Sequence, residues 1–476
     1  MVIFENFGAN IPRKSKKSLV CALIFSKNKK RRKTRREVPT FAAFFIKSKS
    51  MKLYHIVRPL VTLAFKIYFK KIYHIGSENI PKDKPVILSI NHPTAFFEPT
   101  IMACTFPEHD FYFITRGDVF RKDFFRRVCE SLLMIPIYRF KDGFDNLRKN
   151  EASMSLITAL LGEGKKIQIF AEGSTETIKR LRPLQKGMAR MAFDAYKKHG
   201  DQDLQIVPVG FTYSDPHHPR REVMIKIGAA IPLSNYYDLY VQNAAKAINQ
   251  VTADVQKAMR PCLVHVERDA DLILSEQLFK LYRNSFPQTV FPIVQRSERR
   301  LLAHQEMANN LLQISDNQRF ELAEKTTSYF SKLEKERLND LAVAQPWHAN
   351  FKNLLVLIIG FIPFVIGWFG HGLPNLYAKR VRDTQVKYLE FEGPVRAGVS
   401  VGAMVIQYVI LFVLAIIISN WAFWTFLFIL PFLGFYSLIY VDLLRNYTHC
   451  QRLKRLNTEG VLALRSERET ILKMVR

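Results

Sequence analysis

Between Val86 and Gly228, short apolar runs bounded by turn residues alternate with longer stretches of helical periodicity. Apolar runs of this kind are typical of buried strands, whereas the longer periodic stretches predict helices. The alternation of the two predicts an α/β domain built on a mixed, largely parallel sheet with flanking helices. The strand-like runs are 85–90, 113–118, 134–139, 167–176 and 205–210, and the helical stretches are 145–161 and 186–198.

Two other regions predict helices of different kinds. Residues 51–75 are apolar, with five interspersed lysines and arginines and no acidic residue. This pattern predicts a basic amphipathic helix in a membrane interface, with a helix packed against the sheet as the alternative. Residues 236–345 are charged, rich in Gln and Glu, and short of helix breakers. They predict a helical module whose charge is mostly a solvated face.

Three apolar stretches follow, at 354–369, 399–419 and 421–440. The last two are long enough to cross a bilayer and predict a helical hairpin, because only Asn420 separates them. The first is shorter and contains Gly360 and Pro363, which predicts a re-entrant segment.

Basic residues around these stretches predict their orientation. Cations collect on the cytoplasmic side of membrane helices, so we expect the basic loop and the basic tail to lie there. The cations concerned are Lys379, Arg380, Arg382 and Lys387 in the loop, and Arg452, Lys454 and Arg455 in the tail. The prediction is a membrane region over 346–445 and a basic cytoplasmic tail over 446–476.

The formal charge of +28 indicates an anionic partner, either nucleic acid or a membrane surface. No nucleic-acid-binding signature accompanies the charge, whereas long apolar segments do, so the membrane surface is the favoured partner and no nucleic acid is expected. Residues 1–50 hold 14 lysines and arginines against two acidic residues and predict a disordered basic extension. It would serve as a lipid-surface anchor or a nuclear-type address, unless Met51 is the natural start.

The five cysteines are scattered without paired spacing, which predicts neither a zinc site nor a disulfide framework. The candidate chemistry lies elsewhere, directly after the run 85–90. There Asn91-His92 is followed, six positions after the histidine, by Glu98. A histidine whose ring is oriented by a carboxylate can take a proton from an alcohol near neutral pH. His92 and Glu98 are therefore the predicted catalytic pair.

Other polar residues follow the remaining strand-like runs. Arg116 and Arg139 stand at the ends of two of them, and a guanidinium matches phosphate oxygens. Alternatively, these arginines neutralise nearby carboxylates such as Asp118. Glu172-Gly173-Ser174 interrupts the run 167–176, where free backbone N–H groups would face an anion; a carboxylate that only complements a helix dipole is the alternative. Pro208 interrupts the run 205–210, as expected at a strand edge or bulge.

In this order and spacing, the blocks resemble the glycerolipid acyltransferase family over about residues 75–235. The pair His92 and Glu98-Pro99 is similar to the longer first block of the branch that includes fungal glycerol-3-phosphate acyltransferases, with Glu in place of Asp. The segment 170–174 resembles the family's Phe-Pro-Glu-Gly-Thr block, with Ala171 in place of the proline. The basic stretch 182–189, which contains Lys186, resembles the helix start that follows this block.

The resemblance implies roles for these residues. The second block ends at Arg139, which would hold the phosphate of the acceptor, and the third block, 170–174, would help to hold the acceptor itself. The fourth block, at 207–209, is associated with the acyl donor. The substrate-binding residues so implied are Arg116, Arg139, Glu172, Gly173, Ser174, Lys186 and Pro208. Backbone N–H groups near Gly173, or around Pro93 and Thr94, are the candidates for stabilising the oxyanion.

The implied activity is transfer of an acyl group from a thioester to the hydroxyl of glycerol-3-phosphate or lysophosphatidic acid at a membrane. No cofactor or metal is expected beyond acyl-CoA or acyl-carrier protein as co-substrate. The implied partners are membrane lipids and a phosphorylated glycerol acceptor, with the catalytic domain facing the cytoplasm. Two alternatives stay open: a catalytically weak or inactive lipid-binding scaffold of the same fold, and an acyltransferase for another lysolipid.

Overall fold

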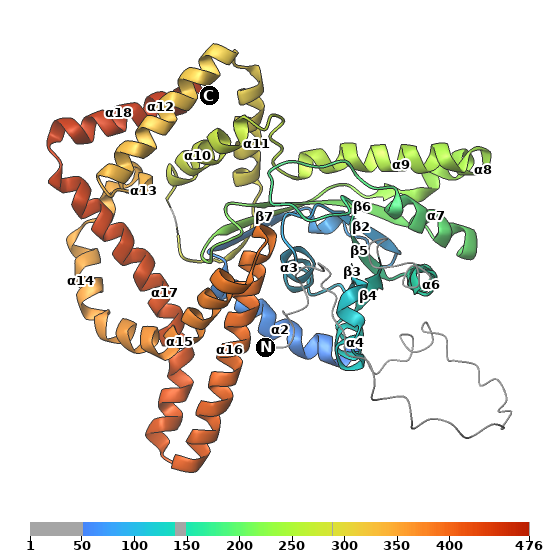
Figure 1. Ribbon diagram of the computed structural model, residues 1–476, viewed down its shortest axis with the longest axis horizontal. Coiled ribbons are helices and arrows are strands. Elements are labelled where there is room, and N and C mark those ends of the chain that lie inside the picture. The colour runs from blue at the N-terminus through green and yellow to red at the C-terminus, as the bar shows by residue number, and fades with distance from the viewer. Residues whose placement is uncertain (1–50, 139–148, 288, 476) are drawn as a thin grey trace, which may run out of the picture. The chain divides into compact units, whose positions relative to one another are not determined.

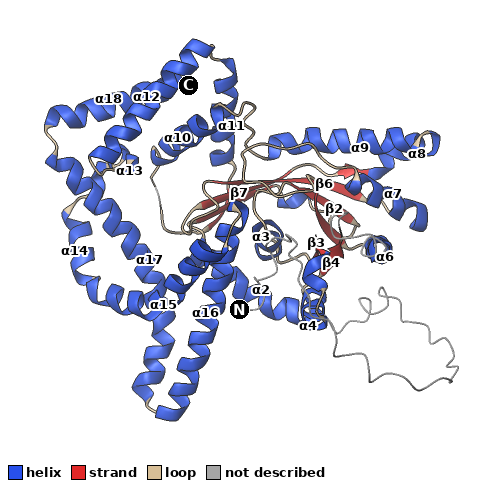
Figure 2. Cartoon of the chain, viewed as in Figure 1, coloured by secondary structure: helices blue, strands red, loops and turns tan. Residues whose placement is uncertain are grey.

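The computed structural model describes residues 51–475, apart from 139–148 and 288. The predictions made for residues 1–50 and for Arg139 lie outside this part of the chain. The described residues form one nine-stranded sheet, with β4-β3-β5-β2-β6-β7-β1-β9 in order and β8 paired to β6 (Figures 1 and 2). Its strands are β1 (Lys71–Ile75), β2 (Val86–Ile90), β3 (Phe111–Arg116), β4 (Met134–Ile137), β5 (Lys166–Phe170), β6 (Gln205–Tyr213), β7 (Glu222–Ile227), β8 (Ile231–Pro232) and β9 (Val294–Arg296).

The predicted α/β fold with a mixed, largely parallel sheet is confirmed. Strands β4, β3, β5, β2 and β6 run parallel to one another, as do β7, β1 and β9. The two sets meet at the antiparallel pair β6–β7. Because parallel strands end at the same edge of a sheet, the segments that follow β2, β3, β4 and β5 gather at one edge.

Helices cover both faces of the sheet. On one face Gln168 of β5 donates to the carbonyl of Pro99 in α3 (Phe97–Thr105). On the other, the hydroxyl of Ser89 in β2 contacts the sulfur of Met259 in α9 (Ala244–Met259). Figure 1 shows α3 and α9 on opposite sides of the strands. The helices α4 (Asp123–Ser131), α6 (Lys149–Gly162), α7 (Gly187–His199) and α8 (Tyr237–Gln242) complete this part of the fold.

The predicted helix over 51–75 is too long. The helix α2 spans Met51–Tyr68, and the strand β1 follows it between β7 and β9. The correction has a local cause, since β1 reads Lys-Ile-Tyr-His-Ile, a β-prone sequence whose first three residues are buried. Helix α2 packs on α3 through one face, with Phe65 buried, and exposes Ile56, Leu60 and Leu63 on another. Both proposed surroundings of this helix, the domain and an apolar medium, are therefore compatible with it.

The region 236–345 is mostly helical, but it also contributes a strand that the sequence prediction missed. The three-residue β9 pairs with β1 at the end of the sheet, and it is too short to show an alternating pattern. Four helices of this region pack with the last helix of the chain around one apolar cluster that includes Leu278, Phe279 and Tyr329. They are α10 (Asp271–Asn284), α11 (Arg299–Gln313), α12 (Asp316–Lys335), α13 (Asp340–Ala344) and α18 (Thr458–Met474).

Pro208 does not lie on an edge strand, so that part of the prediction is wrong. It is paired with Ser89 on the interior strand β6. On the other side of β6, however, the antiparallel partner changes from β8 at Ile206 to β7 at Val209. The carbonyl of Pro208 points to that side, because it accepts from the N–H of Gly228 at 2.8 Å. The missing N–H of the proline therefore faces the break between two partners, where no ladder bond is lost.

The apolar end of the chain forms four helices. Two of them, α16 (Leu389–Ile418) and α17 (Trp421–Arg455), are long and apolar enough to cross a membrane, and Ser419 and Asn420 join them. The preceding pair, α14 (Phe351–Ile359) and α15 (Phe361–Gln385), is bent by 55° and is a third candidate if counted as one span. Close approach of α15 to α17 requires Gly367, because a Cβ there would lie 2.1 Å from the carbonyl oxygen of Leu433.

Candidate active site

The histidine loop comprises residues 91–96, between the end of β2 and the start of α3. Asn91 fixes the exit from β2: its amide donates to the carbonyl of Phe211 at 3.0 Å, and its oxygen accepts from the N–H of the same residue at 2.7 Å. The side chain therefore replaces a partner strand for one residue of β6. Since Asn91 is buried, both bonds are shielded from water, and the peptide group that leads into His92 is held rigidly.

His92 and Glu98 face each other, as the sequence spacing predicts. Nδ1 of His92 lies 3.0 Å from Oε2 of Glu98, whose side chain is fully buried in the first turn of α3. A carboxylate at this distance accepts a hydrogen bond from Nδ1–H, which leaves the lone pair on Nε2. No hydrogen bond to Nε2 is present among the described residues, and the ring is 12% exposed. Nε2 is thus the atom that can receive a proton.

Glu98 has further partners that fix its orientation. Its other oxygen, Oε1, accepts from the hydroxyl of Thr94 at 2.7 Å, from the N–H of Thr94 at 3.2 Å and from the hydroxyl of Tyr213 at 3.0 Å. Burial, with the neighbouring charge of Glu98 as a second cause, raises the pKa of Tyr213 well above its ordinary value. Tyr213 is therefore a permanent donor. The helix dipole of α3 also favours a carboxylate here, because Glu98 lies at its N-terminal end.

Glu172 supports the loop from the neighbouring strand. Its Oε2 accepts from the backbone N–H of His92 at 3.0 Å and from Arg182 at 2.8 Å, while Oε1 accepts from the N–H of Arg182 at 2.9 Å. The side chain is 3% exposed, so this pair is buried. Glu172 therefore positions His92 through the backbone, and its contacts with Arg182 go beyond those of a carboxylate that only complements a helix dipole. Its implied role in holding the acceptor stays a prediction.

Gly173 and Ser174 complete the turn after β5. Gly173 has φ of +76°, a left-handed conformation, and a Cβ there would meet Gln185 at 2.9 Å. The side chain and carbonyl of Ser174 both accept from Arg182. Phe170, the last residue of β5, stacks on the His92 ring with centroids 3.8 Å apart. Glycine is needed at 173 both for the turn and for the approach of Gln185.

The N–H groups predicted to stabilise an oxyanion already have partners. The N–H of Gly173 donates to the carbonyl of Phe170 at 3.0 Å, and that of Thr94 donates to Glu98. Pro93 has no N–H to offer. Both turns thus use these N–H groups internally, and an oxyanion donor among the groups around them stays a prediction.

The remaining predicted residues are not gathered around His92. Arg116 follows β3 at the same edge of the sheet, but its Nε and Nη2 donate to both oxygens of Asp118, at 3.2 and 2.5 Å. This is the arrangement foreseen in the alternative reading of that arginine. Lys186 is exposed at the start of α7. Pro208 lies within β6, beneath the loop that follows the strand ends.

The histidine loop is attached to a membrane-crossing candidate. The N–H of Ala95 donates to the carbonyl of Glu390 in the first turn of α16 at 3.1 Å. Beside it, the rings of Phe96 and Phe391 meet edge to face. Phe96 is 47% exposed, which is high for a phenylalanine next to a buried carboxylate. The candidate base therefore lies where an apolar helix leaves the domain.

Sequence reasoning missed four residues that hold the site: Thr94, Phe170, Arg182 and Tyr213. Thr94 carries a weak local signal, because hydroxyl residues are common near helix starts, and its hydroxyl accepts from the N–H of Phe97 at 3.2 Å. Arg182 and Tyr213 reach Glu172 and Glu98 across 10 and 115 positions. No local pattern reports such contacts.

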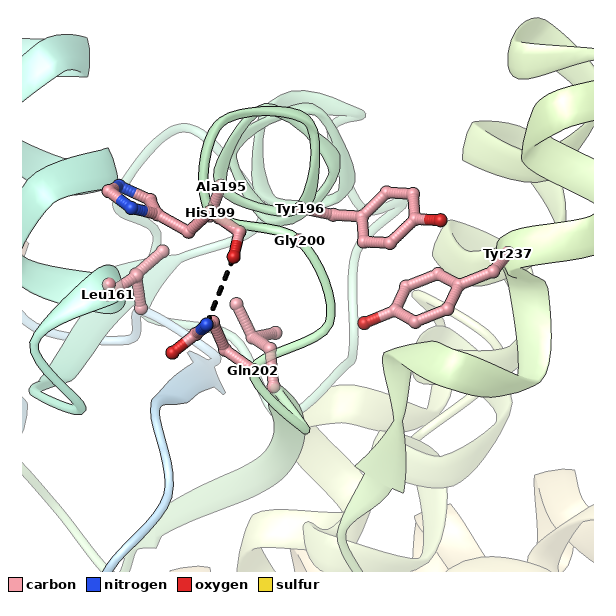
Figure 3. A pocket seen from close by; sticks show the side chains of 9 residues that line it. Leu161, Ala195, Tyr196, His199, Gly200, Gln202 and Tyr237 are labelled. Atoms are coloured by element: carbon pink, nitrogen blue, oxygen red, sulfur yellow. Dashed lines mark hydrogen bonds between the residues drawn. The ribbon is translucent and has the colours of Figure 1, made fainter.

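A small pocket lies at the opposite edge of the sheet from His92 (Figure 3). It lies between the C-terminal ends of α6 and α7 and the start of α8, and its volume is about 10 Å³. Gln202 donates there to the carbonyl of His199 at 3.0 Å. This pocket is not the substrate site, because it has room for about one water and lies near the beginnings of β5 and β6, away from the strand ends that carry His92.

Comparison with known proteins supports the resemblance read from the sequence. Residues 71–212 match the acyltransferase family model. Over 200 residues the chain is 25% identical to an uncharacterized acyltransferase of Schizosaccharomyces pombe, covering 42% of this chain and 29% of that protein. Over 196 residues it is 26% identical to glycerol-3-phosphate O-acyltransferase 1 of Saccharomyces cerevisiae, covering 40% and 25%. The match thus spans little more than a quarter of either relative.

One solved structure is also similar, the 1-acyl-sn-glycerophosphate (LPA) acyltransferase PlsC from Thermotoga maritima. It shares 16% identity and a TM-score of 0.30, over 46% of this chain and 88% of that one. This likeness is too low to support an argument. The predicted resemblance is confirmed by the family model, and the chain contains an acyltransferase-family domain at residues 71–212.

Proposed function

We propose that this protein is a membrane O-acyltransferase that moves a fatty acyl group from a thioester to the hydroxyl of a phosphorylated glycerol. The observation that carries the proposal is the His92–Glu98 pair at 3.0 Å, with Nε2 turned away from the carboxylate, in a loop bonded to the first turn of α16. A base of this kind placed at an apolar helix suits a reaction in which one substrate brings a lipid chain.

The chemistry follows from the protonation states. Nε2 of His92 removes the proton of the acceptor hydroxyl, and the oxygen attacks the thioester carbonyl. The tetrahedral intermediate collapses with cleavage of the C–S bond, and the imidazolium returns its proton to the departing thiolate. Glu98 stabilises the imidazolium while it exists and keeps Nδ1 protonated throughout. The steps need no covalent acyl-enzyme.

The acceptor is proposed to be glycerol-3-phosphate or lysophosphatidic acid. The relative from Saccharomyces cerevisiae, named as a glycerol-3-phosphate O-acyltransferase, favours the first. Arg116 lies at the same edge of the sheet and would donate hydrogen bonds to the phosphate, either in place of its bonds to Asp118 or in addition to them. We also propose that the catalytic domain faces the cytoplasm, because the loop and tail around α15 and α17 are basic.

Replacement of His92 by Ala tests the proposal. We expect acyl transfer to fall at least about 10²-fold, because a positioned general base contributes about 10² to 10⁴ in rate. Purified membranes would be assayed with labelled glycerol-3-phosphate and lysophosphatidic acid, each with acyl-CoA and acyl-carrier protein. Membrane association of the variant, measured by flotation, should be unchanged, because in the described part of the chain the His92 side chain bonds to Glu98 and stacks on Phe170 and makes no hydrogen bond or ring contact with α16. Absence of transfer by the wild-type protein with every pair would favour the lipid-binding scaffold instead.

A further inference from the structure

A large cavity with both polar and apolar lining lies beside the histidine loop, on the side of α10. Its volume is about 720 Å³, within the range of small-molecule sites. Asn91, Pro93 and Thr177 line one end of it. Two of these hold the loop, because Thr177 donates to the carbonyl of Pro93 and Asn91 bonds to β6. A ligand in the cavity would therefore have one end next to His92.

Several distant parts of the chain line the cavity. Among them are the end of β6 with the turn before β7, helix α10, and Leu389 at the start of α16. Helix α10 lies outside the family match, which ends at residue 212. The domain that carries the candidate chemistry thus supplies only part of this cavity.

Positive charge is in excess along these walls. Six cations and three carboxylates line the cavity: Lys70, Lys179, Arg220, Arg221, Lys280 and Arg283 against Asp215, Glu222 and Glu276. Pairing accounts for some of them, since Lys179 contacts Glu276 and Arg221 contacts Asp215 at 3.3 Å. Arg220 is paired with Asp442 of α17 at 2.9 Å.

Two cations of α10 are not neutralised in this way. Neither Lys280 nor Arg283 makes a salt bridge with any residue that the structure describes, although both line the cavity. Nη1 of Arg283 is buried without a hydrogen-bond partner in the described chain. Burial is also the main cause that lowers the pKa of Arg283 and that of Lys179. A buried cationic donor without a partner is costly, and an anion with several oxygens would remove that cost.

We propose that this cavity binds the phosphate-bearing end of the acyl donor, a thioester whose leaving group carries several phosphates. The inference rests on the proposed acyl transfer and adds to it the substrate that occupies the α10 side of the loop. Guanidinium and ammonium groups at separate positions match an extended polyphosphate. Glycerol-3-phosphate has a single phosphate on three carbons and is smaller than the ligands that fill cavities of this volume. The thioester end would then reach His92 past Asn91 and Pro93.

Direct binding tests the inference without depending on turnover. Coenzyme A, glycerol-3-phosphate and inorganic phosphate would each be titrated calorimetrically against the full chain in detergent micelles. The variants are Lys280→Gln combined with Arg283→Met, and Lys257→Gln as the matched control, because Lys257 is an exposed lysine of α9. We expect the double variant to bind coenzyme A about 10- to 100-fold more weakly and the control to bind it as the wild type does.

Two results would overturn the inference. Coenzyme A binding equally well to the double variant and the wild type would show that the cavity cations do not face the donor. Loss of glycerol-3-phosphate binding alone would assign the cavity to the acceptor. Coenzyme A should still bind to His92→Ala, so a failure of the proposed chemistry and a failure of the cavity assignment are separable. A raised KM for acyl-CoA in the double variant, with an unchanged KM for the acceptor, is the matching kinetic result.

Discussion

The two sides of the histidine loop differ in how completely their charged groups are paired. Toward α3 and β5, both carboxylates are matched: Glu98 has four hydrogen bonds, and Glu172 is held by Arg182 and by the N–H of His92. Toward α10, Nη1 of Arg283 is buried without a hydrogen-bond partner among the described residues, although the residue as a whole is partly exposed. The first side is complete without a substrate, as a preorganised catalytic group needs to be. The second is complete only with an anion.

Glu98→Gln tests whether the fully bonded carboxylate on the α3 side is needed for acyl transfer. An amide cannot accept all the hydrogen bonds that Glu98 receives. It also lacks the negative charge that stabilises the His92 imidazolium through Nδ1. We expect kcat for acyl transfer to fall about 10³- to 10⁴-fold, as in other histidine–carboxylate pairs. Glu176→Gln is the control, because that carboxylate is 53% exposed and bonds only at the rim, to Arg182. An effect of equal size in the control would show that net charge, and not the orientation of His92, matters.

Arg182→Met tests the support from β5. Removal of one partner leaves the buried Glu172 carboxylate with its two backbone donors, so we expect a loss of about 3 kcal/mol in the free energy of unfolding. In a domain of this size that corresponds to a fall in Tm of about 6–12 °C, which a thermal-shift assay in detergent would detect. Arg180→Met, which removes a neighbouring arginine paired with the exposed Asp269, is the control. An unchanged Tm for Arg182→Met would contradict the importance of the Glu172 pair.

Arg283→Met is the smallest change and should have the opposite sign. With no ligand present, replacing an incompletely paired buried cation by an apolar side chain of similar length is expected to raise stability by about 1 kcal/mol, or about 2–4 °C in Tm. The two arginine-to-methionine variants, measured by the same assay, form a matched pair. If both lower Tm alike, the α10 side is as complete as the β5 side and the comparison fails.

Much of the fold was predictable because its signals are local. The strands β2 to β6 are apolar runs with turn residues at their ends, and the order His92, Glu98, Glu172 places both carboxylates near the histidine once the sheet is parallel. The short edge strand β9 and the end of α2 at Tyr68 were not predictable in this way. Their conformation depends on pairing with strands more than a hundred residues away.

The site divides along the same line. His92 and Glu98 are six positions apart, so spacing alone predicts their contact. The contacts of Glu172 were not predictable in this way, because its partner Arg182 and the N–H of His92 are brought to it by the tertiary fold. The cavity combines α10, β6 and α16, three elements that no single motif links. Chemistry carried by one loop could thus be read from the sequence, whereas the binding surface assembled around it could not.

The hydrogen bond between the N–H of Ala95 and the first turn of α16 links the histidine loop to the surrounding membrane. An apolar helix tilts when its length differs from the thickness of the surrounding hydrocarbon. Any such tilt would pull on Ala95, three residues from the base, through its 3.1 Å hydrogen bond to Glu390. We therefore expect turnover to vary with the chain length of the lipids in reconstituted vesicles, whereas equal rates in thin and thick membranes would show that the base is mechanically insulated from its surroundings.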